Sequence, residues 1–297
     1  MRFAISIGVL LTVLATGLST LDWYRAEASS QEANFGGVQV LPPIGDTIFV
    51  AASTIGFFTL GTTILAGARG ASRTVIVSLG ASASAATLYG ILGSSLYEGA
   101  PPYVLGTVFK TSSIVILGLI ALFARSRLLA AGLFFGALGD ALLAWSSETF
   151  LFGALAFLIG HLVYSALFLR TGVGAGAALK QPPRLVAALA LIAAAVVMTS
   201  ALVPRDSALS VPLSIYTGVL TLMALTSFTL PAARWLAMAG AVLFFISDGF
   251  VAWNMFHPAA DLTLAFWRSF TGWMIYWAGQ AAICFGALGL HKAAPRS

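Results

Sequence analysis

The feature that most constrains this chain is a succession of apolar runs, each long enough to cross a lipid bilayer. A helix needs about 20 apolar residues to span a hydrocarbon core of about 30 Å. Candidate runs lie at 3–20, 46–67, 74–95, 104–124, 128–146, 149–169, 185–203, 211–230, 235–256 and 267–290. Only 8% of the residues are charged, whereas roughly 25% are charged in a soluble domain. We predict an all-α, polytopic transmembrane helical bundle of about ten helices.

Basic residues are distributed unequally between the two ends of the predicted helices. If the N-terminus is inside, one face receives Arg2, Arg69, Arg73, Arg125, Arg127, Arg170, Lys180, Arg184, Arg234, Lys292 and Arg296, and the other receives Arg25, Lys110, Arg205 and Arg268. Lys and Arg are retained on the cytoplasmic side. We therefore expect a protein of the cell membrane, taken as a bacterial inner membrane, with both termini cytoplasmic. The net charge of +5 follows from this asymmetry, and we expect no nucleic-acid partner because no soluble segment carries a basic patch with stacking aromatics.

The first apolar run has a second interpretation. Arg2, about 15 apolar residues and Ala26–Glu27–Ala28 also resemble a secretory signal peptide. We favour a retained anchor; cleavage would leave nine helices in the same orientation. The lone Cys284 excludes an intrachain disulfide and is best interpreted as a small buried hydrophobe.

Two carboxyl groups interrupt the apolar pattern. Asp140 lies in AGLFFGALGDALLAW and Asp248 in GAVLFFISDGFVAW, each with no basic residue within one helical turn. Ionisable groups inside a membrane are costly and face the bundle interior or a water-filled cavity. A structural carboxyl bonded to a neighbouring helix is the alternative, but two of them in so apolar a chain favour function. Gly132, Gly136 and Gly139 form a small-residue face beside Asp140, which indicates close helix packing first and ligand access second.

Further polar side chains lie at comparable depths in other helices. They are Lys110, His161, Tyr216, Tyr276 and Gln280. We predict that they meet in one polar cavity open toward the outer leaflet. Each also has a structural alternative: Lys110 can snorkel to the interface, while His161 with Tyr164 and Tyr276 with Gln280 share helical faces and can bridge helices by hydrogen bonds.

These polar residues belong to an ordered set of short sequence motifs. The motifs are Lys-Thr at 110–111, GDALL at 139–143, FGALAFLIGHLVY at 152–164, Tyr216, GAVLFFISDGFVA at 240–252 and YWAGQ at 276–280. In order and spacing they resemble the YhhN-like family, which contains the lysoplasmalogenases. The resemblance covers about residues 73–291 and implies an eight-helix catalytic core at 73–297, after an N-terminal extension at 1–72 with two transmembrane segments. This chain departs from the family at Thr111, where proline is frequent, and at Gly279, where alanine is common.

The resemblance implies an intramembrane hydrolase that cleaves the vinyl ether bond of a lysoplasmalogen, a lysophospholipid, to a fatty aldehyde and a glycerophospho-headgroup without a cofactor. The two aspartates of the family map onto Asp140 and Asp248, its helix-embedded lysine onto Lys110, and its His-x-x-Tyr pair onto His161 and Tyr164. The aspartates would be catalytic and the other polar residues would bind substrate. The sequence leaves the headgroup, the chain length and the oligomeric state open.

The chemistry fits the residues independently of the family. A vinyl ether is hydrolysed by protonation of its β-carbon to an oxocarbenium ion, which water captures. A protonated Asp140 or Asp248 can serve as the acid while its ionised partner stabilises the cation, as in paired-carboxylate glycoside hydrolysis; which is the acid stays open. Lys110 would meet the lipid phosphate as a point charge. Water and the glycerol hydroxyl would be oriented by His161, Tyr164, Tyr216, Tyr276 and Gln280.

Other function classes fit less well. Catalytic zinc normally takes three protein ligands rich in histidine, and only His161 of the three histidines lies inside a predicted helix away from its end. No Gly-x-Ser-x-Gly elbow occurs, and Ser247 beside Asp248 is best interpreted as a donor to that carboxylate or a packing residue. The remaining alternative is a proton-coupled carrier or lipid-binding membrane protein in which the same carboxylates relay protons.

Overall fold

A computed structural model describes residues 71–93, 104–202, 207–257 and 262–290 of the chain. Within these ranges every regular element is helical. The α-helices are α3 (Arg73–Gly93), α4 (Val104–Phe123), α5 (Arg127–Trp145), α6 (Phe150–Thr171), α7 (Ala175–Leu179), α8 (Pro182–Leu202), α9 (Ser210–Ser227), α10 (Trp235–Phe256) and α11 (Leu262–Leu288). Two single 3₁₀ turns, Ser147–Thr149 and Ala232–Arg234, lead into α6 and α10.

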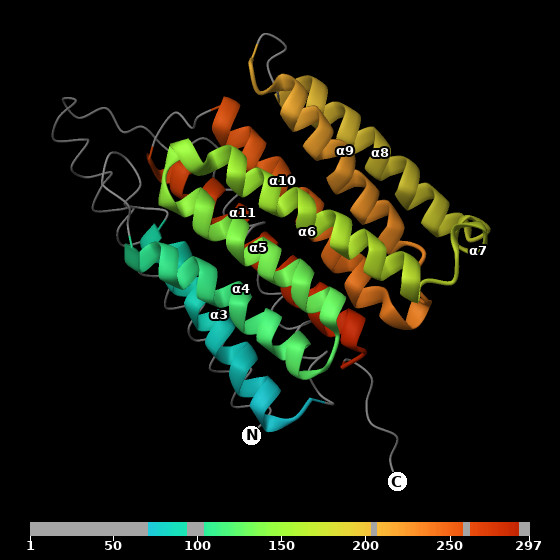
Figure 1. The fold of residues 1–297 in the computed structure, drawn as a ribbon. Helices are drawn as coiled ribbons and strands as arrows, with labels where there is room; N and C mark the ends of the chain where they lie inside the picture. The colour runs from blue at the N-terminus through green and yellow to red at the C-terminus, as the bar shows by residue number, and fades with distance from the viewer. Residues whose placement is uncertain (1–70, 94–103, 203–206, 258–261, 291–297) are drawn as a thin grey trace, which may run out of the picture.

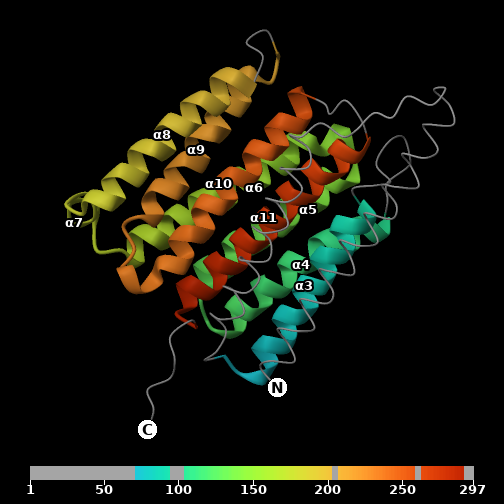
Figure 2. The same ribbon diagram turned by 180° about the vertical axis from the view of Figure 1, so that it is seen from behind.

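Seven long helices close into a ring. In order around it, α3, α4, α5, α6, α9, α10 and α11 each pack against the next, and α11 returns to α3. Figures 1 and 2 show these helices running roughly along one common direction, with α8 outside the ring beside α9. Because the long helices alternate in direction, the C-terminal ends of α5 and α10 and the N-terminal ends of α4, α6, α9 and α11 lie at one end of the bundle, hereafter the outer end.

Six helical segments are long and apolar enough to cross a membrane, which makes this an integral membrane protein. They are Val104–Phe123, Arg127–Trp145, Ser147–Thr171, Pro182–Ser200, Ser210–Ser227 and Ala232–Phe256. In contrast, α11 carries Arg268, Tyr276 and Gln280, and nearly every residue from 271 to 286 is buried among neighbouring helices. A helix enclosed in this way can keep polar side chains that lipid would not tolerate.

Close packing between helices depends on glycine. A Cβ on Gly240 would lie 2.6 Å from the carbonyl oxygen of Gly279, and one on Gly279 would lie 2.9 Å from that of Gly240. These approaches let α10 and α11 pack backbone to backbone, as small residues allow in membrane proteins. The departure from alanine at Gly279 therefore has a packing reason in this chain.

The end of the bundle opposite the outer end is tightly filled. Leu129 and Leu133 of α5, Phe168 of α6 and Phe285 of α11 are fully buried in one apolar cluster there. The turn from α4 to α5 is closed by two hydrogen bonds, from Ser126 N–H to the Ala121 carbonyl and from Arg125 N–H to the Leu122 carbonyl. This is the Schellman pattern, with Arg125 in the left-handed conformation at φ 60°. The ring is therefore closed by apolar packing at this end.

The predicted all-α membrane bundle is confirmed. Each of the eight core helices expected from the sequence has its counterpart, and the boundaries differ by a few residues. The short α7 was not predicted; its five residues follow Gly174, whose φ of 90° turns the chain after α6. The two N-terminal segments, the signal-peptide question and the proposed 1–72 extension lie outside the described residues, except for Ala71 and Ser72.

Candidate active site

A cavity of about 420 Å³ opens inside the ring and extends toward its outer end. Asp140 of α5 and Asp248 of α10 both line it, together with Lys110, Tyr216 and Tyr276. Most of the remaining wall is apolar, with side chains that include Leu143, Phe157, Met198, Leu213, Leu220, Phe250 and Val251. An apolar pocket with a few convergent polar groups is the usual form of a small-molecule site.

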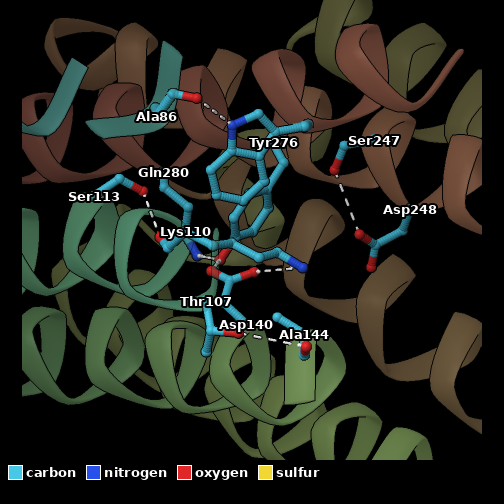
Figure 3. Close-up of polar contacts among 11 residues, drawn as sticks. Ala86, Thr107, Lys110, Ser113, Asp140, Ala144, Ser247, Asp248, Tyr276 and Gln280 are labelled. Atoms are coloured by element: carbon cyan, nitrogen blue, oxygen red, sulfur yellow. Dashed lines mark hydrogen bonds and ion pairs between the residues drawn. The ribbon is translucent and has the colours of Figure 1, made fainter. Parts of the chain in front are cut away.

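The Asp140 carboxyl joins three helices. One oxygen lies 3.6 Å from the Lys110 Nζ on α4, and the other accepts a hydrogen bond of 2.7 Å from the Tyr276 hydroxyl on α11. Figure 3 shows Lys110, Tyr276 and Gln280 gathered around this carboxyl. Asp140 is buried, as is most of the Lys110 side chain. Two opposite charges are thus neutralised against each other inside the bundle, which is how buried charges are normally accommodated.

Aromatic rings hold Lys110 in place. Its Nζ lies 5.4 Å from the centroid of the Tyr89 ring and 5.6 Å from that of Trp273, both within the range of cation–π attraction. The Trp273 indole in turn donates to the Ala86 carbonyl of α3 at 2.8 Å. The neighbouring Trp277 indole donates to Ser82 at 2.9 Å. These bonds fix α11 to α3 and so set the position of the lysine.

Behind Asp140 a chain of hydrogen bonds runs away from the cavity. The Tyr276 hydroxyl accepts from the Gln280 amide at 3.1 Å, and the Gln280 carbonyl oxygen accepts from the Tyr164 hydroxyl at 2.6 Å. Gly136 makes this approach possible, because a Cβ there would lie 2.7 Å from Gln280 Nε2. The small-residue face beside Asp140 therefore serves helix packing, as predicted. Its consequence is a relay of neutral groups, Tyr164–Gln280–Tyr276, which ends on the Asp140 carboxyl.

The Asp248 carboxyl has different neighbours. One oxygen accepts a hydrogen bond of 2.5 Å from the Tyr216 hydroxyl of α9 and lies 3.8 Å from His161 Nε2 of α6. Its other oxygen lies 3.4 Å from the Ser247 hydroxyl, which also donates to the Phe244 carbonyl at 2.6 Å. Figure 3 shows the Ser247 contact. The short bond to the Phe244 carbonyl takes the single hydroxyl proton, so Ser247 contacts the Asp248 carboxyl only at long range. No lysine or arginine within the described ranges pairs with Asp248.

His161 completes this second group. Its Nε2 lies 3.1 Å from the Tyr216 hydroxyl, so His161, Tyr216 and Asp248 form a short hydrogen-bonded series. Its Nδ1 is buried without a hydrogen-bond partner. The neutral tautomer that carries its proton on Nε2 leaves an acceptor unpaired, whereas a proton on Nδ1 leaves a donor unpaired. The Phe244 ring packs edge-on against the imidazole at 4.8 Å and holds its plane.

The predicted site residues are therefore brought together, but at two depths. Lys110, Asp140, Tyr216, Asp248 and Tyr276 line the cavity itself. The other three stand one or two hydrogen bonds behind it, namely His161, Tyr164 and Gln280. The proposed role of Lys110 toward a phosphate stays a prediction; its geometry adds a pairing with Asp140 that the sequence did not indicate.

Among the lining residues that were not proposed as site residues from the sequence, one is charged. Arg268, in the second turn of α11, lines the cavity near its outer end. The available signal was its place among the few basic residues on the predicted outer face. As for metal ions, within the described ranges no three His, Cys, Asp or Glu side chains form a group that could hold one.

Comparison with known proteins gives one match. The model of the YhhN family matches residues 105–287, from the start of α4 nearly to the end of α11, and so includes both aspartates. No curated protein and no solved structure gave a significant match.

Proposed function

The chain belongs to the YhhN family, and from this premise we propose that it is an intramembrane hydrolase of lysoplasmalogens. The observation that carries the proposal is the placement of Asp140 and Asp248, from opposite sides of the ring, on the wall of one largely apolar cavity. Such a cavity suits a single hydrocarbon chain with a polar end. The paired carboxyls suit a reaction that needs an acid and an anion near one reacting atom.

The reaction consumes one water. Protonation of the β-carbon of the vinyl ether converts the C=C–O group to an oxocarbenium ion. Water adds to the α-carbon and loses a proton, which gives a hemiacetal. The hemiacetal C–O bond to glycerol then breaks as the glycerol oxygen takes up a proton and the hemiacetal hydroxyl gives up its own to form the aldehyde C=O. The products are a fatty aldehyde and a glycerophospho-headgroup, and the acid is restored for the next cycle.

The surroundings of the two aspartates support a division of labour. The Tyr276 hydroxyl accepts a hydrogen bond from the Gln280 amide and donates one to the Asp140 carboxyl. Together with the Lys110 ammonium, this favours Asp140 as the ionised partner that stabilises the oxocarbenium ion and receives the proton of water. Asp248 adjoins the His161–Tyr216 series, which can return a proton to it after each cycle. We therefore assign Asp248 as the general acid.

The position of the cavity supports a lipid substrate that enters from the outer leaflet of a bacterial inner membrane. Its lining includes the first residue of α6, Phe150, and residues in the last turn of α10, Asn254 and Met255. The basic residues at helix ends gather at the opposite end of the bundle, at Arg73, Arg127, Arg170, Arg184 and Arg234. By the positive-inside rule that end is cytoplasmic.

The decisive experiment measures aldehyde release by purified protein in detergent. The substrate is a 1-alkenyl lysophospholipid, and the controls are the 1-acyl and saturated 1-alkyl analogues. We expect aldehyde from the alkenyl lipid alone, in the presence of a metal chelator, and none after Asp140→Asn or Asp248→Asn. Normal turnover by either variant would contradict the assignment of the two aspartates. If the wild-type protein releases no aldehyde from substrates with any headgroup, and instead shows proton-linked solute flux in liposomes, the result would favour a proton-coupled carrier.

A further inference from the structure

Arg268 places a guanidinium group at the outer end of the cavity. Its Cζ lies 4.2 Å from the centroid of the Trp253 ring, and its Nη1 donates to the His257 carbonyl at 3.0 Å. Stacking on the ring and one hydrogen bond fix the plane of the guanidinium. The group is therefore held in one orientation on the cavity wall rather than extended into solvent.

The donor capacity of this guanidinium is largely unused. Its Nε is buried and makes no hydrogen bond. The ion pairs within the described ranges, Lys110–Asp140 and His161–Asp248, leave Arg268 without a carboxylate. Two more polar side chains line the cavity beside it: the Asn254 amide and the Ser269 hydroxyl, 3.5 Å apart. An arginine flanked by neutral donors is a typical arrangement for binding a phosphate group.

The spacing along the helices matches the length of a lysolipid headgroup. Arg268 precedes Tyr276 by eight residues of α11, which is about 12 Å along the helix axis. In a glycerophospholipid, roughly seven bonds separate the β-carbon of the vinyl ether from phosphorus, a span of about 8 Å when extended. The arginine side chain can bridge the difference. A vinyl ether beside Asp140 and Asp248 thus directs its phosphate toward Arg268.

We propose that Arg268, assisted by Asn254 and Ser269, binds the phosphate diester of the lysolipid substrate. This inference rests on the proposed function and adds the residue that recognises the headgroup. It transfers to Arg268 the role expected of Lys110, whose charge lies opposite Asp140 and two turns from the outer end of α4. The ligand chemistry is a phosphate ester; we commit to the lipid headgroup as its source, not a soluble ester.

A purely structural role makes a different prediction. Arg268 bonds to the carbonyl of His257, directly after α10, so it could simply fasten the ends of α10 and α11 together. In that case its loss would impair every substrate equally. A phosphate role would impair only substrates that carry phosphate. The distinction requires two substrates that differ in this group alone.

The kinetic test compares a 1-alkenyl-glycerophosphocholine with the matching 1-alkenylglycerol, which lacks phosphate. We expect Arg268→Gln to lower kcat/KM for the phospholipid about tenfold to hundredfold, mainly through KM. We expect a change of at most about threefold for the alkenylglycerol, a partial loss for Arg268→Lys, and no change for the control Arg127→Gln at the opposite end of the bundle. Equal losses on both substrates, or no loss on either, would overturn the proposal.

A binding test separates this inference from the proposed function. Saturated 1-alkyl-glycerophosphocholine and 1-alkylglycerol have no vinyl ether, so their binding to wild-type protein and Arg268→Gln can be measured without turnover. We expect the phospholipid to lose its advantage over the glycerol in the variant, even if the wild-type protein proves to release no aldehyde. Binding of soluble glycerophosphocholine as tight as that of the alkyl lipid would indicate a site for free phosphate esters and overturn the assignment to a lipid headgroup.

Discussion

The two sides of the cavity hold the same functional group in different settings. On the α5 side, Asp140 faces a full positive charge on Lys110, and its side chain is 3% exposed. On the α10 side, Asp248 faces the hydroxyl of Tyr216 and the imidazole of His161, and its side chain is 14% exposed. One carboxyl is charge-compensated and enclosed, whereas the other is hydrogen-bonded and open to the cavity. Identical side chains thereby lie in unequal environments, which is consistent with the different roles proposed for them.

This difference also determines what each aspartate does for the fold. Removal of a charge from a buried ion pair leaves its partner uncompensated, which costs more than the pair itself contributes. Replacement of a carboxyl that is bonded to neutral donors leaves groups that can still hydrogen-bond to an amide. Substitution of either aspartate should therefore abolish activity, whereas the loss of stability should be larger on the Asp140 side than on the Asp248 side.

The largest expected effect is the loss of activity in Asp140→Asn and Asp248→Asn, at least about a thousandfold for each, because either removes the acid or the anion. Their stabilities should differ. We expect Asp140→Asn to lower the free energy of unfolding by about 3–5 kcal/mol, since Lys110 stays buried without its counter-charge, and Asp248→Asn by about 1 kcal/mol. Denaturant unfolding in detergent measures both. Equal losses of stability would contradict the asymmetry described above.

The next largest effect concerns the lysine of the Lys110–Asp140 ion pair. Lys110→Met should lower the free energy of unfolding by about 3–5 kcal/mol and activity by about a hundredfold, because the Asp140 carboxylate loses its cation. The double variant Lys110→Met/Asp140→Asn should recover most of the stability but none of the activity. Lys180→Met, at an exposed position between α7 and α8, is the control. A double variant less stable than Lys110→Met would refute the pairing.

Each aspartate accepts a hydrogen bond from one tyrosine, so substitution of these tyrosines compares the two sides of the cavity by a smaller change. Tyr216→Phe removes the hydroxyl that bridges Asp248 and His161 by hydrogen bonds, so we expect kcat to fall about a hundredfold. Tyr276→Phe leaves Asp140 with Lys110, and we expect a loss of about tenfold with about 1 kcal/mol of stability. Steady-state aldehyde release measures both under one set of conditions. The reverse order would require exchanging the roles of the two aspartates.

The smallest expected effect concerns the close packing that lets Gln280 and Tyr276 approach Asp140. A Cβ at Gly136 would lie 2.7 Å from Gln280 Nε2 and 3.3 Å from the Tyr276 hydroxyl. We therefore expect Gly136→Ala to displace these groups and lower activity about fivefold to tenfold, with a modest loss of stability. Gly80→Ala on α3 meets nothing within 4 Å and should be neutral or slightly stabilising. Equal activity in both variants would show that the relay tolerates displacement.

Much of this arrangement could be predicted because the lipid environment restricts which residues can occur along a membrane-spanning helix. Apolar runs of bilayer length located the helices, and polar residues within them located the site, since lipid excludes such groups elsewhere. Asp140, Asp248 and Tyr276 were identified in this way, and all three line the cavity. Their approximate depth followed from helical rise alone.

The partners of these residues could not be predicted, because they depend on how the helices rotate and pack. Lys110 and Asp140 lie on different helices, so neither helical periodicity nor charge counting indicates their contact. The bond between Tyr164 and Gln280 joins residues 116 positions apart. Arg268 was visible only as a basic residue on the predicted outer face, and its contact with Trp253 depends on the packing of α10 against α11.

The relay behind Asp140 ends at Tyr164, which stacks on Phe168 within the apolar cluster that fills the opposite end of the bundle. A cell membrane stores energy as a proton gradient, and an acid–base site inside it is a potential leak. Among the described residues, the chain of side-chain hydrogen bonds goes no further than this tyrosine. If the proposed reaction takes place here, its proton transfers stay within the membrane and do not dissipate the proton gradient.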